Sequence, residues 1–176
     1  MTLELTHKTA YIGLGSNLEE PVKKLQQSLA LLDSEATQLR AVSTFYVSKP
    51  QGPQDQPDYV NAVAKIETQL LPEALLIYLQ QIEQQLGKVK KRHWGERCID
   101  LDLLLYGDET PVGFKEQSLN LPHLQLPHPM MTQRDFVLLP LQELAPTIEL
   151  SDPSGKRQPI TGWLEQLTER FVDFSE

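Results

Sequence analysis

An aliphatic run in the middle of the chain most restricts what this sequence can fold into. Residues 98–107 read CIDLDLLLYG, in which two aspartates interrupt a segment that is otherwise typical of a buried β-strand. Side chains alternate between the two faces of a strand, which predicts one wholly aliphatic face and one face that carries both carboxylates. The aliphatic face would hold Ile99, Leu101, Leu103 and Leu105, and the other face Asp100, Asp102, Leu104 and Tyr106.

The two aspartates of this strand predict a cation site. Asp100 and Asp102 are two residues apart, so in an extended strand they are separated by roughly 6.6 Å, a gap that their side chains can close around a ligand. Two carboxylates so close repel each other and resist the loss of water, and a bound cation relieves both costs. We therefore expect Asp100 and Asp102 to bind a metal ion.

Composition limits the classes of protein to which the chain can belong. With 176 residues, 40% of them hydrophobic, residues 1–176 are expected to form a single globular domain. The 16 basic and 24 acidic residues give a net charge of -8, which argues against nucleic acid or an anionic membrane as the main partner. One cysteine, Cys98, cannot form an internal disulfide, and the first residues lack an apolar segment of signal-peptide length, so we expect a cytoplasmic protein.

The order of predicted elements indicates an α+β fold. Strand patterns cover residues 9–15, 38–47 and 59–68 as well as the aspartate strand, and a loop with three prolines separates the second from the third. Helical spacing predicts helices over residues 22–32, from Pro72 to Gly87, near residues 133–139 and near residues 160–171. Consecutive strands are close enough to pair antiparallel, which predicts an antiparallel sheet with helices packed on it.

Several polar motifs allow more than one interpretation. GLGSNL supplies only G-x-G of a dinucleotide-binding motif, so a tight turn is favoured. Gln80 and Glu83 lie three apart on the polar side of their helix, where a solvated face is the simpler explanation. The basic segment KVKKRHWGER is either a solvated run of charge or, beside two carboxylates that bind metal, a phosphate-binding loop.

Three further side chains also remain open. Alternation places Tyr59 and Asn61 on one face of their strand, where they either pack in the core or line a polar pocket. In a pocket, the amide of Asn61 could form paired hydrogen bonds with a flat heterocycle. His128, between two prolines, could belong to a turn or donate a hydrogen bond to phosphate.

The segment HWGERCIDLD resembles the signature of the 6-hydroxymethyl-7,8-dihydropterin pyrophosphokinase family. The motifs GLGSNL, FYVSKPQGPQDQPDYVNAV, QQIEQQLG, IDLDLLLYG, LPHP and QRDFVLLPL also occur in the family's order and approximate spacing, between residues 11 and 146. The resemblance implies a ferredoxin-like α+β fold. It also implies that pyrophosphate is transferred from ATP to the hydroxymethyl group of the pterin, giving AMP and pterin pyrophosphate in folate biosynthesis.

The resemblance further implies a role for individual residues. Two Mg²⁺ ions would be held by Asp100 and Asp102. The pterin would be bound by Ser48, Gln51, Tyr59, Asn61, Trp94 and Phe136, the last two stacking on its flat ring. ATP would contact Gln80, Glu83, Lys90, Arg97, His128 and Arg134, and transition-state charge would be stabilised by Lys88, Arg97 and Arg134. The expected partners are these two small substrates, bound by a monomer.

Two other classes of function compete with this assignment. A two-metal phosphohydrolase would also use paired carboxylates and basic residues, but it needs an activated water and no stacking pair around a heterocycle. An RNA-binding module on a ferredoxin-like sheet would need aromatic residues on its strands and a basic face, but the net charge is -8 and no such aromatic motif appears.

Overall fold

The structure is a computed structural model that describes residues 7–87 and 98–172, and it confirms the predicted α+β class. The first part contains β1 (Lys8–Ser16), α1 (Pro21–Leu32), β2 (Thr37–Val42), β3 (Tyr46–Ser48), β4 (Tyr59–Thr68) and α2 (Pro72–Gln85). The second part contains β5 (Asp100–Thr110), β6 (Gly113–Glu116), β7 (Leu119–Leu121), β8 (Leu124–Leu126), the 3-10 turn η1 (Met131–Gln133), α3 (Asp135–Leu144), β9 (Glu149–Ser151), β10 (Arg157–Pro159) and α4 (Ile160–Glu165).

The main sheet places β1 at its centre. Its strands follow the order β2-β4-β1-β5-β6, β3 continues the pairing along β4, and all neighbours are antiparallel. Helix α1 follows β1 and helix α2 connects β4 to β5, an order consistent with the expected ferredoxin-like arrangement. The middle of the sheet is therefore built from the three strands β4, β1 and β5.

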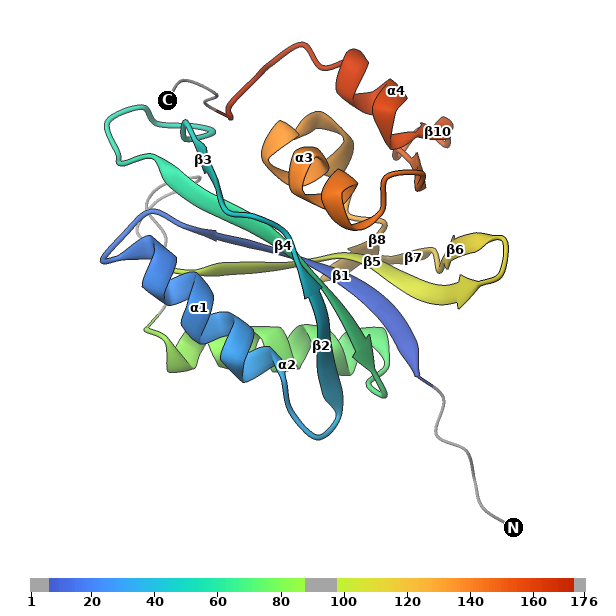
Figure 1. The fold of residues 1–176 in the computed structure, drawn as a ribbon, viewed down its shortest axis with the longest axis horizontal. Coiled ribbons are helices and arrows are strands. Elements are labelled where there is room, and N and C mark those ends of the chain that lie inside the picture. The colour runs from blue at the N-terminus through green and yellow to red at the C-terminus, as the bar shows by residue number, and fades with distance from the viewer. Residues whose placement is uncertain (1–6, 88–97, 173–176) are drawn as a thin grey trace.

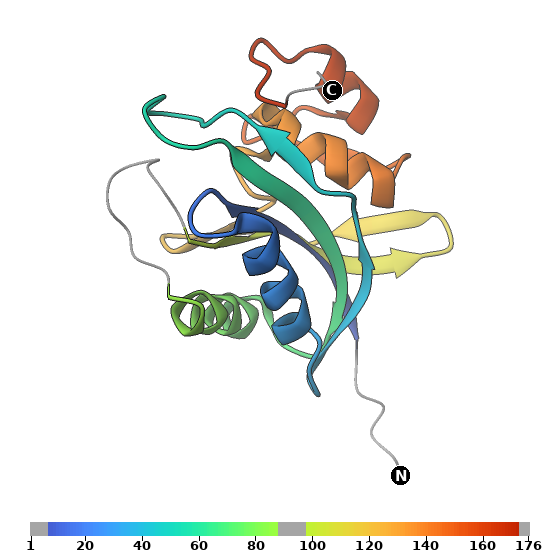
Figure 2. The same ribbon diagram turned by 60° about the vertical axis from the view of Figure 1, so that its left-hand side comes forward.

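Helices cover both faces of this sheet. Figure 1 shows α1 and α2 on one face and α3 with α4 on the other, and Figure 2 shows the same two layers from the side. Leu25 of α1 and Leu79 of α2 are buried in the first core, whereas Leu138 and Leu141 of α3 and Trp163 of α4 are buried in the second. Since each face has its own apolar core, the sheet is a fixed platform between two layers of helices.

A one-residue bulge in β5 alters the predicted alternation. Tyr11 of β1 pairs with Leu105 but the next residue, Ile12, pairs with Leu103, so Leu104 is an extra residue in the ladder. Beyond the bulge the faces exchange: Leu105 lies in the α3 core and Tyr106 in the α1/α2 core, the reverse of the prediction. The part of β5 before the bulge, which carries the aspartates, keeps the predicted faces.

Four other elements differ from the sequence prediction. Residues 38–47 form two strands, because that segment has more residues than the stretch of β4 beside it and the ladder breaks. Val22 of α1 is 45% exposed and does not pack in the core. The helix expected near residues 133–139 continues to Leu144, and the last helix ends at Glu165 instead of continuing to residue 171. The predicted strand 59–68 and the start of the helix at Pro72 are confirmed.

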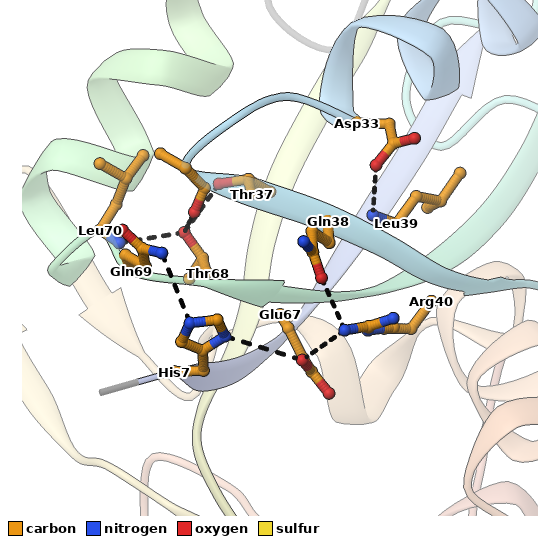
Figure 3. A network of polar contacts seen from close by, with 11 residues as sticks. His7, Asp33, Thr37, Gln38, Leu39, Arg40, Glu67, Thr68, Gln69 and Leu70 are labelled. Atoms are coloured by element: carbon orange, nitrogen blue, oxygen red, sulfur yellow. Dashed lines mark hydrogen bonds and ion pairs between the residues drawn. The ribbon is translucent and has the colours of Figure 1, made fainter. Parts of the chain in front are cut away.

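Polar contacts fasten the edge strand β2 to β4 (Figure 3). The hydroxyls of Thr37 and Thr68 are 2.7 Å apart, and an Arg40 Nη atom lies 2.9 Å from the Glu67 carboxylate. These contacts are at the C-terminal end of β4, whereas Tyr59 and Asn61 are at its N-terminal end. These contacts therefore join β2 to β4 at the end of the sheet that lies away from Tyr59 and Asn61.

Candidate functional site

A pocket opens between β1, β4, β5 and the start of α3, and its volume is about 670 Å³ including its open mouth. That size is within the range of pockets that bind small molecules. Eight of the residues predicted to bind metal, pterin or phosphate line it: Ser48, Gln51, Tyr59, Asn61, Asp100, Asp102, Arg134 and Phe136. The structure therefore brings together residues from four separate segments of the chain; we call this cavity the main pocket.

The floor of the main pocket is a row of residues across three strands. Gly15 of β1 pairs with Asn61 of β4 on one side and with Asp100 of β5 on the other. Gly13 occupies the same position opposite Asp102. Both glycines are strand residues in β1, so the tight turn predicted for GLGSNL is wrong at these positions. A glycine here leaves room above the strand for the side chains on either side.

Asp100 and Asp102 lie on one side of β5 and line the same pocket, as the alternation predicts. The side chain of Glu83, which is buried, reaches β5 between them: its Oε2 accepts a hydrogen bond of 2.9 Å from the backbone N–H of Leu101. The solvated face predicted for Glu83 is therefore wrong, since this carboxylate anchors the aspartate strand to α2. Gln80, one turn earlier, is exposed.

Asn61 and Ser48 form a buried polar pair on the β3/β4 side. Asn61 Nδ2 donates to Ser48 Oγ at 2.6 Å, and both side chains are buried. The neighbouring proline loop is anchored to the end of β1, because Asn17 Nδ2 donates to Gln56 Oε1 and to the Pro57 carbonyl, both at 2.9 Å. These contacts fix a polar edge on the wall opposite the aspartates.

Phe136 and Arg134 form the wall contributed by the start of α3. The Arg134 guanidinium lies 5.6 Å from the centre of the Phe136 ring, within the range of a cation–π contact. Burial lowers the pKa of Arg134, and the negative charges of Asp102 and Asp100 act in the opposite direction. A buried cation thus faces the two carboxylates, and its Nε atom has no hydrogen-bond partner among residues 7–87 and 98–172.

A second pocket lies on the other side of Asp102. Its lining includes Asp102 and His128 together with Leu76, Leu101, Leu103, Pro122, His123, Leu124, Gln125 and Pro129. Burial lowers the pKa of His128; Asp102 opposes this shift and Arg134 adds to it, so the ring is neutral near pH 7. Its Nδ1 accepts a hydrogen bond of 3.2 Å from the Met130 N–H, which leaves the proton on Nε2 as a donor.

Four predicted site residues, Lys88, Lys90, Trp94 and Arg97, lie outside the described residues. Conversely, six lining residues of the main pocket were not assigned to the site by sequence reasoning: Gly13, Leu14, Gly15, Lys49, Ala62 and Val137. The sequence did contain a signal for the two glycines. The G-x-G motif puts them two positions apart in a predicted strand, so both lie on the same face. Lys49 had no comparable signal, because its segment belongs to no periodic element.

The donor set of the main pocket fits Mg²⁺. Magnesium is usually held by one or two carboxylates, with water and substrate phosphates completing its coordination. Asp100 and Asp102 supply two carboxylates on one wall, and within the described part of the chain no cluster of three or more His, Cys, Asp or Glu side chains could hold an ion without a substrate. The same part of the chain contains no helix long and apolar enough to cross a bilayer.

Comparison with known proteins agrees with this geometry. A sequence model of the 7,8-dihydro-6-hydroxymethylpterin-pyrophosphokinase (HPPK) family matches residues 11–146. The chain is 47% identical over 166 residues to the 2-amino-4-hydroxy-6-hydroxymethyldihydropteridine pyrophosphokinase of Haemophilus influenzae, covering 94% of each chain. It is 46% identical over 150 residues to the protein of the same name from Pseudomonas aeruginosa, covering 85% of this chain and 86% of the relative.

A solved structure supports the fold. A crystal structure described as HPPK-DHPS in complex with substrates has a TM-score of 0.60 and 12% sequence identity, and the similarity covers 91% of this chain and 43% of that chain. The family match and the two relatives of nearly equal length are the stronger findings, since they extend over the strands and helices that line both pockets. The chain belongs to the 7,8-dihydro-6-hydroxymethylpterin-pyrophosphokinase family.

Proposed function

We propose that the main pocket and the second pocket together form the reaction site of this pyrophosphokinase of folate biosynthesis. The enzyme transfers pyrophosphate from ATP to the hydroxymethyl group of 6-hydroxymethyl-7,8-dihydropterin, giving AMP and pterin pyrophosphate. One observation carries the placement: Asp102 lines both pockets, so ligands in the two cavities would meet at the aspartate pair. Neither a phosphohydrolase nor an RNA-binding module is supported by the family match.

The main pocket suits the pterin. The buried Asn61–Ser48 pair provides hydrogen-bonding groups at one edge, and Tyr59 and Gln51 line the same side. Phe136 offers an aromatic face in the same pocket, which suits a flat ring. From this arrangement we propose Ser48, Gln51, Tyr59, Asn61 and Phe136 as pterin-binding residues, with Trp94 as the second stacking residue.

The aspartate pair would hold the metal. We propose that Asp100 and Asp102 bind two Mg²⁺ ions together with the phosphates of ATP, which matches the way magnesium is usually bound. When bound, these ions would neutralise charge on the transferring group. The two carboxylates on the rigid strand β5, anchored through Leu101 and Glu83, would orient the phosphates toward the pterin hydroxymethyl group.

The second pocket suits the nucleotide. His128 is neutral and can donate from Nε2 to a phosphate oxygen, and Arg134 lies beside the aspartates with a fixed positive charge. We propose that Arg134, with Lys88 and Arg97, stabilises the negative charge that develops during transfer. Gln80, Glu83, Lys90 and His128 complete the proposed set of ATP-binding residues. Because the Glu83 carboxylate accepts a hydrogen bond from the Leu101 N–H of β5, its effect on ATP binding would be indirect, through the position of the aspartate strand.

Product analysis tests this function. The purified chain is incubated with ATP, Mg²⁺ and 6-hydroxymethyl-7,8-dihydropterin, and the nucleotides are separated by chromatography. We expect AMP and pterin pyrophosphate in equal amounts and no AMP when the pterin is left out. ADP or inorganic phosphate as the main product would contradict the proposal.

We also propose that residues 1–176 act as one cytoplasmic, monomeric domain. Sedimentation of the purified protein would test whether it is a monomer.

A further inference from the structure

Residues 171–172, here called the C-terminal segment, return to the wall of the main pocket. Val172 forms an isolated antiparallel bridge with Ser48, and the backbone N–H of Lys49 donates to the Phe171 carbonyl at 2.7 Å. The segment thereby extends the pairing of β3 at the edge where Ser48 and Lys49 line the pocket. It lies beyond residues 11–146, the part of the chain matched by the family.

Asp135, the first residue of α3, holds this segment in place. Its Oδ2 accepts hydrogen bonds from the backbone N–H groups of Phe171 at 2.8 Å and Val172 at 2.9 Å. The residue is fully buried, and its other oxygen, Oδ1, has no hydrogen-bond partner within the described part of the chain. Hydrogen bonds to a charged acceptor are stronger than neutral ones, so one carboxylate oxygen fixes two consecutive backbone groups.

The same contacts determine where Phe136 lies. Phe136 follows Asp135 in the chain, and its ring packs edge-to-face against Phe171, with centroids 5.7 Å apart and planes at 78°. Arg134 lies over the Phe136 ring as well. Three residues of the pocket wall, Ser48, Lys49 and Phe136, therefore contact the C-terminal segment, and Asp135 fastens that segment to α3.

We propose that Asp135 is a positioning residue for the pterin: by holding residues 171–172 against β3 and Phe136, it sets the spacing of the wall that contacts the ring. This inference rests on the proposed function of the main pocket. The effect is specific to one substrate, because Ser48, Lys49 and Phe136 do not line the second pocket, where the nucleotide is placed. A small displacement of a wall that orients a reactant can cost a large factor in rate.

A purely structural role for Asp135 makes a different prediction. A carboxylate in the first turn of a helix also stabilises that helix through its dipole, and loss of that effect would lower stability without favouring one substrate. Asp135→Asn separates the two roles, since the amide oxygen can still accept both N–H groups while the charge is gone. Asp135→Ala removes both the acceptor and the charge.

Steady-state kinetics of the full chain test the proposal, with each substrate varied while the other is saturating. We expect Asp135→Ala to raise the KM for the pterin by about tenfold and to leave the KM for ATP within about twofold. Asp135→Asn should restore most of the pterin KM. The matched control is Asp33→Ala, which removes an exposed carboxylate that accepts the backbone N–H of Leu39 and lines neither the main pocket nor the second pocket; it should change neither KM.

A chain that ends at Arg170 provides a second route, because it removes the segment and leaves every residue of the pocket wall. It should raise the pterin KM as Asp135→Ala does, and adding Asp135→Ala to it should have little further effect, as expected for residues that act together. Equal changes in both KM values, or Asp135→Asn behaving like Asp135→Ala, would overturn the inference. A wild-type protein that forms no pterin-dependent AMP would instead overturn the proposed function.

Discussion

The side chain of Asn61 occupies the space above Gly15: a Cβ atom on residue 15 would lie 2.9 Å from Asn61 Oδ1. Real Cβ atoms do not approach an oxygen so closely, and Asn61 is buried and bonded to Ser48, so it cannot move freely. The glycine is thus required by the polar edge of the pocket. At position 13, by contrast, an added Cβ atom would lie 3.5 Å from the Leu104 side chain, which is an ordinary contact distance.

This difference gives a matched pair of variants. Gly15→Ala should displace Asn61 from Ser48 and raise the KM for the pterin by about tenfold, because overpacking at this point costs roughly 1–3 kcal/mol. Gly13→Ala, on the same face of the same strand, should have a clearly smaller effect. Initial-rate measurements and thermal unfolding of both variants check this. A larger KM increase for Gly13→Ala would show that Asn61 does not depend on Gly15.

The aspartate pair should matter for turnover and not for folding. We expect Asp100→Asn and Asp102→Asn each to reduce kcat by at least about a hundredfold at limiting Mg²⁺, since each removes a carboxylate proposed to bind the metal. Without metal, both variants should unfold close to the wild-type temperature, because the relief of repulsion between the two carboxylates is offset by weaker attraction to the buried Arg134. Wild-type turnover in either variant would remove that residue from the metal site. Chelation of the metal should abolish turnover and leave thermal unfolding of the wild type nearly unchanged.

Glu83 should contribute to stability through β5. Glu83→Ala leaves the buried N–H of Leu101 without its carboxylate acceptor, and loss of a hydrogen bond to a charged group costs roughly 1.5–3 kcal/mol. Denaturant unfolding should show this loss, and Glu83→Gln, which keeps an acceptor oxygen, should recover part of it. Gln80→Ala is the control on the exposed side of the same helix. Equal stability of Glu83→Ala and the wild type would show that α2 does not anchor the aspartate strand.

Glu143 should make stability depend on pH. Its carboxylate accepts hydrogen bonds from Tyr46 and from the backbone and hydroxyl of Thr44, which ties α3 to the segment around β3. Burial pushes the pKa of Glu143 upward, but these hydrogen bonds outweigh it and hold the pKa below the usual glutamate value. A depressed pKa in the folded state adds stability above the unfolded-state pKa, and that stability is lost as the pH falls through the folded-state pKa.

The corresponding experiment compares unfolding free energies between about pH 6 and pH 3, the window in which a glutamate with a lowered pKa takes up its proton. Glu143→Gln should lose less stability over this range than the wild type. Because Glu143 is largely exposed, the difference should not exceed about 1 kcal/mol. Glu35→Gln, with the same change of charge at an exposed loop position, should follow the wild type. An identical pH profile for Glu143→Gln would exclude this contribution.

Much of the fold was determined by local sequence pattern. The strand Tyr59–Thr68 and the helix that begins at Pro72 agree with prediction, because alternation and helical spacing are set by residues within one element. The aspartate pair was predictable for the same reason: two residues separated by one position share a face of any strand. Local pattern also placed Asn61 and Tyr59 together, although it left open whether they packed in a core or lined a pocket.

Only the tertiary structure decided which of these residues meet. The bulge at Leu104 exchanged the faces of Leu105 and Tyr106, and it exists because β5 has one more residue than the length of β1 with which it pairs. Glu83 anchors β5 and Asp135 holds residues 171–172, contacts across 18 and 36 or 37 positions of the chain that no periodicity encodes. Local sequence fixes the direction in which a side chain points along its own element, whereas its partner depends on how separate elements pack.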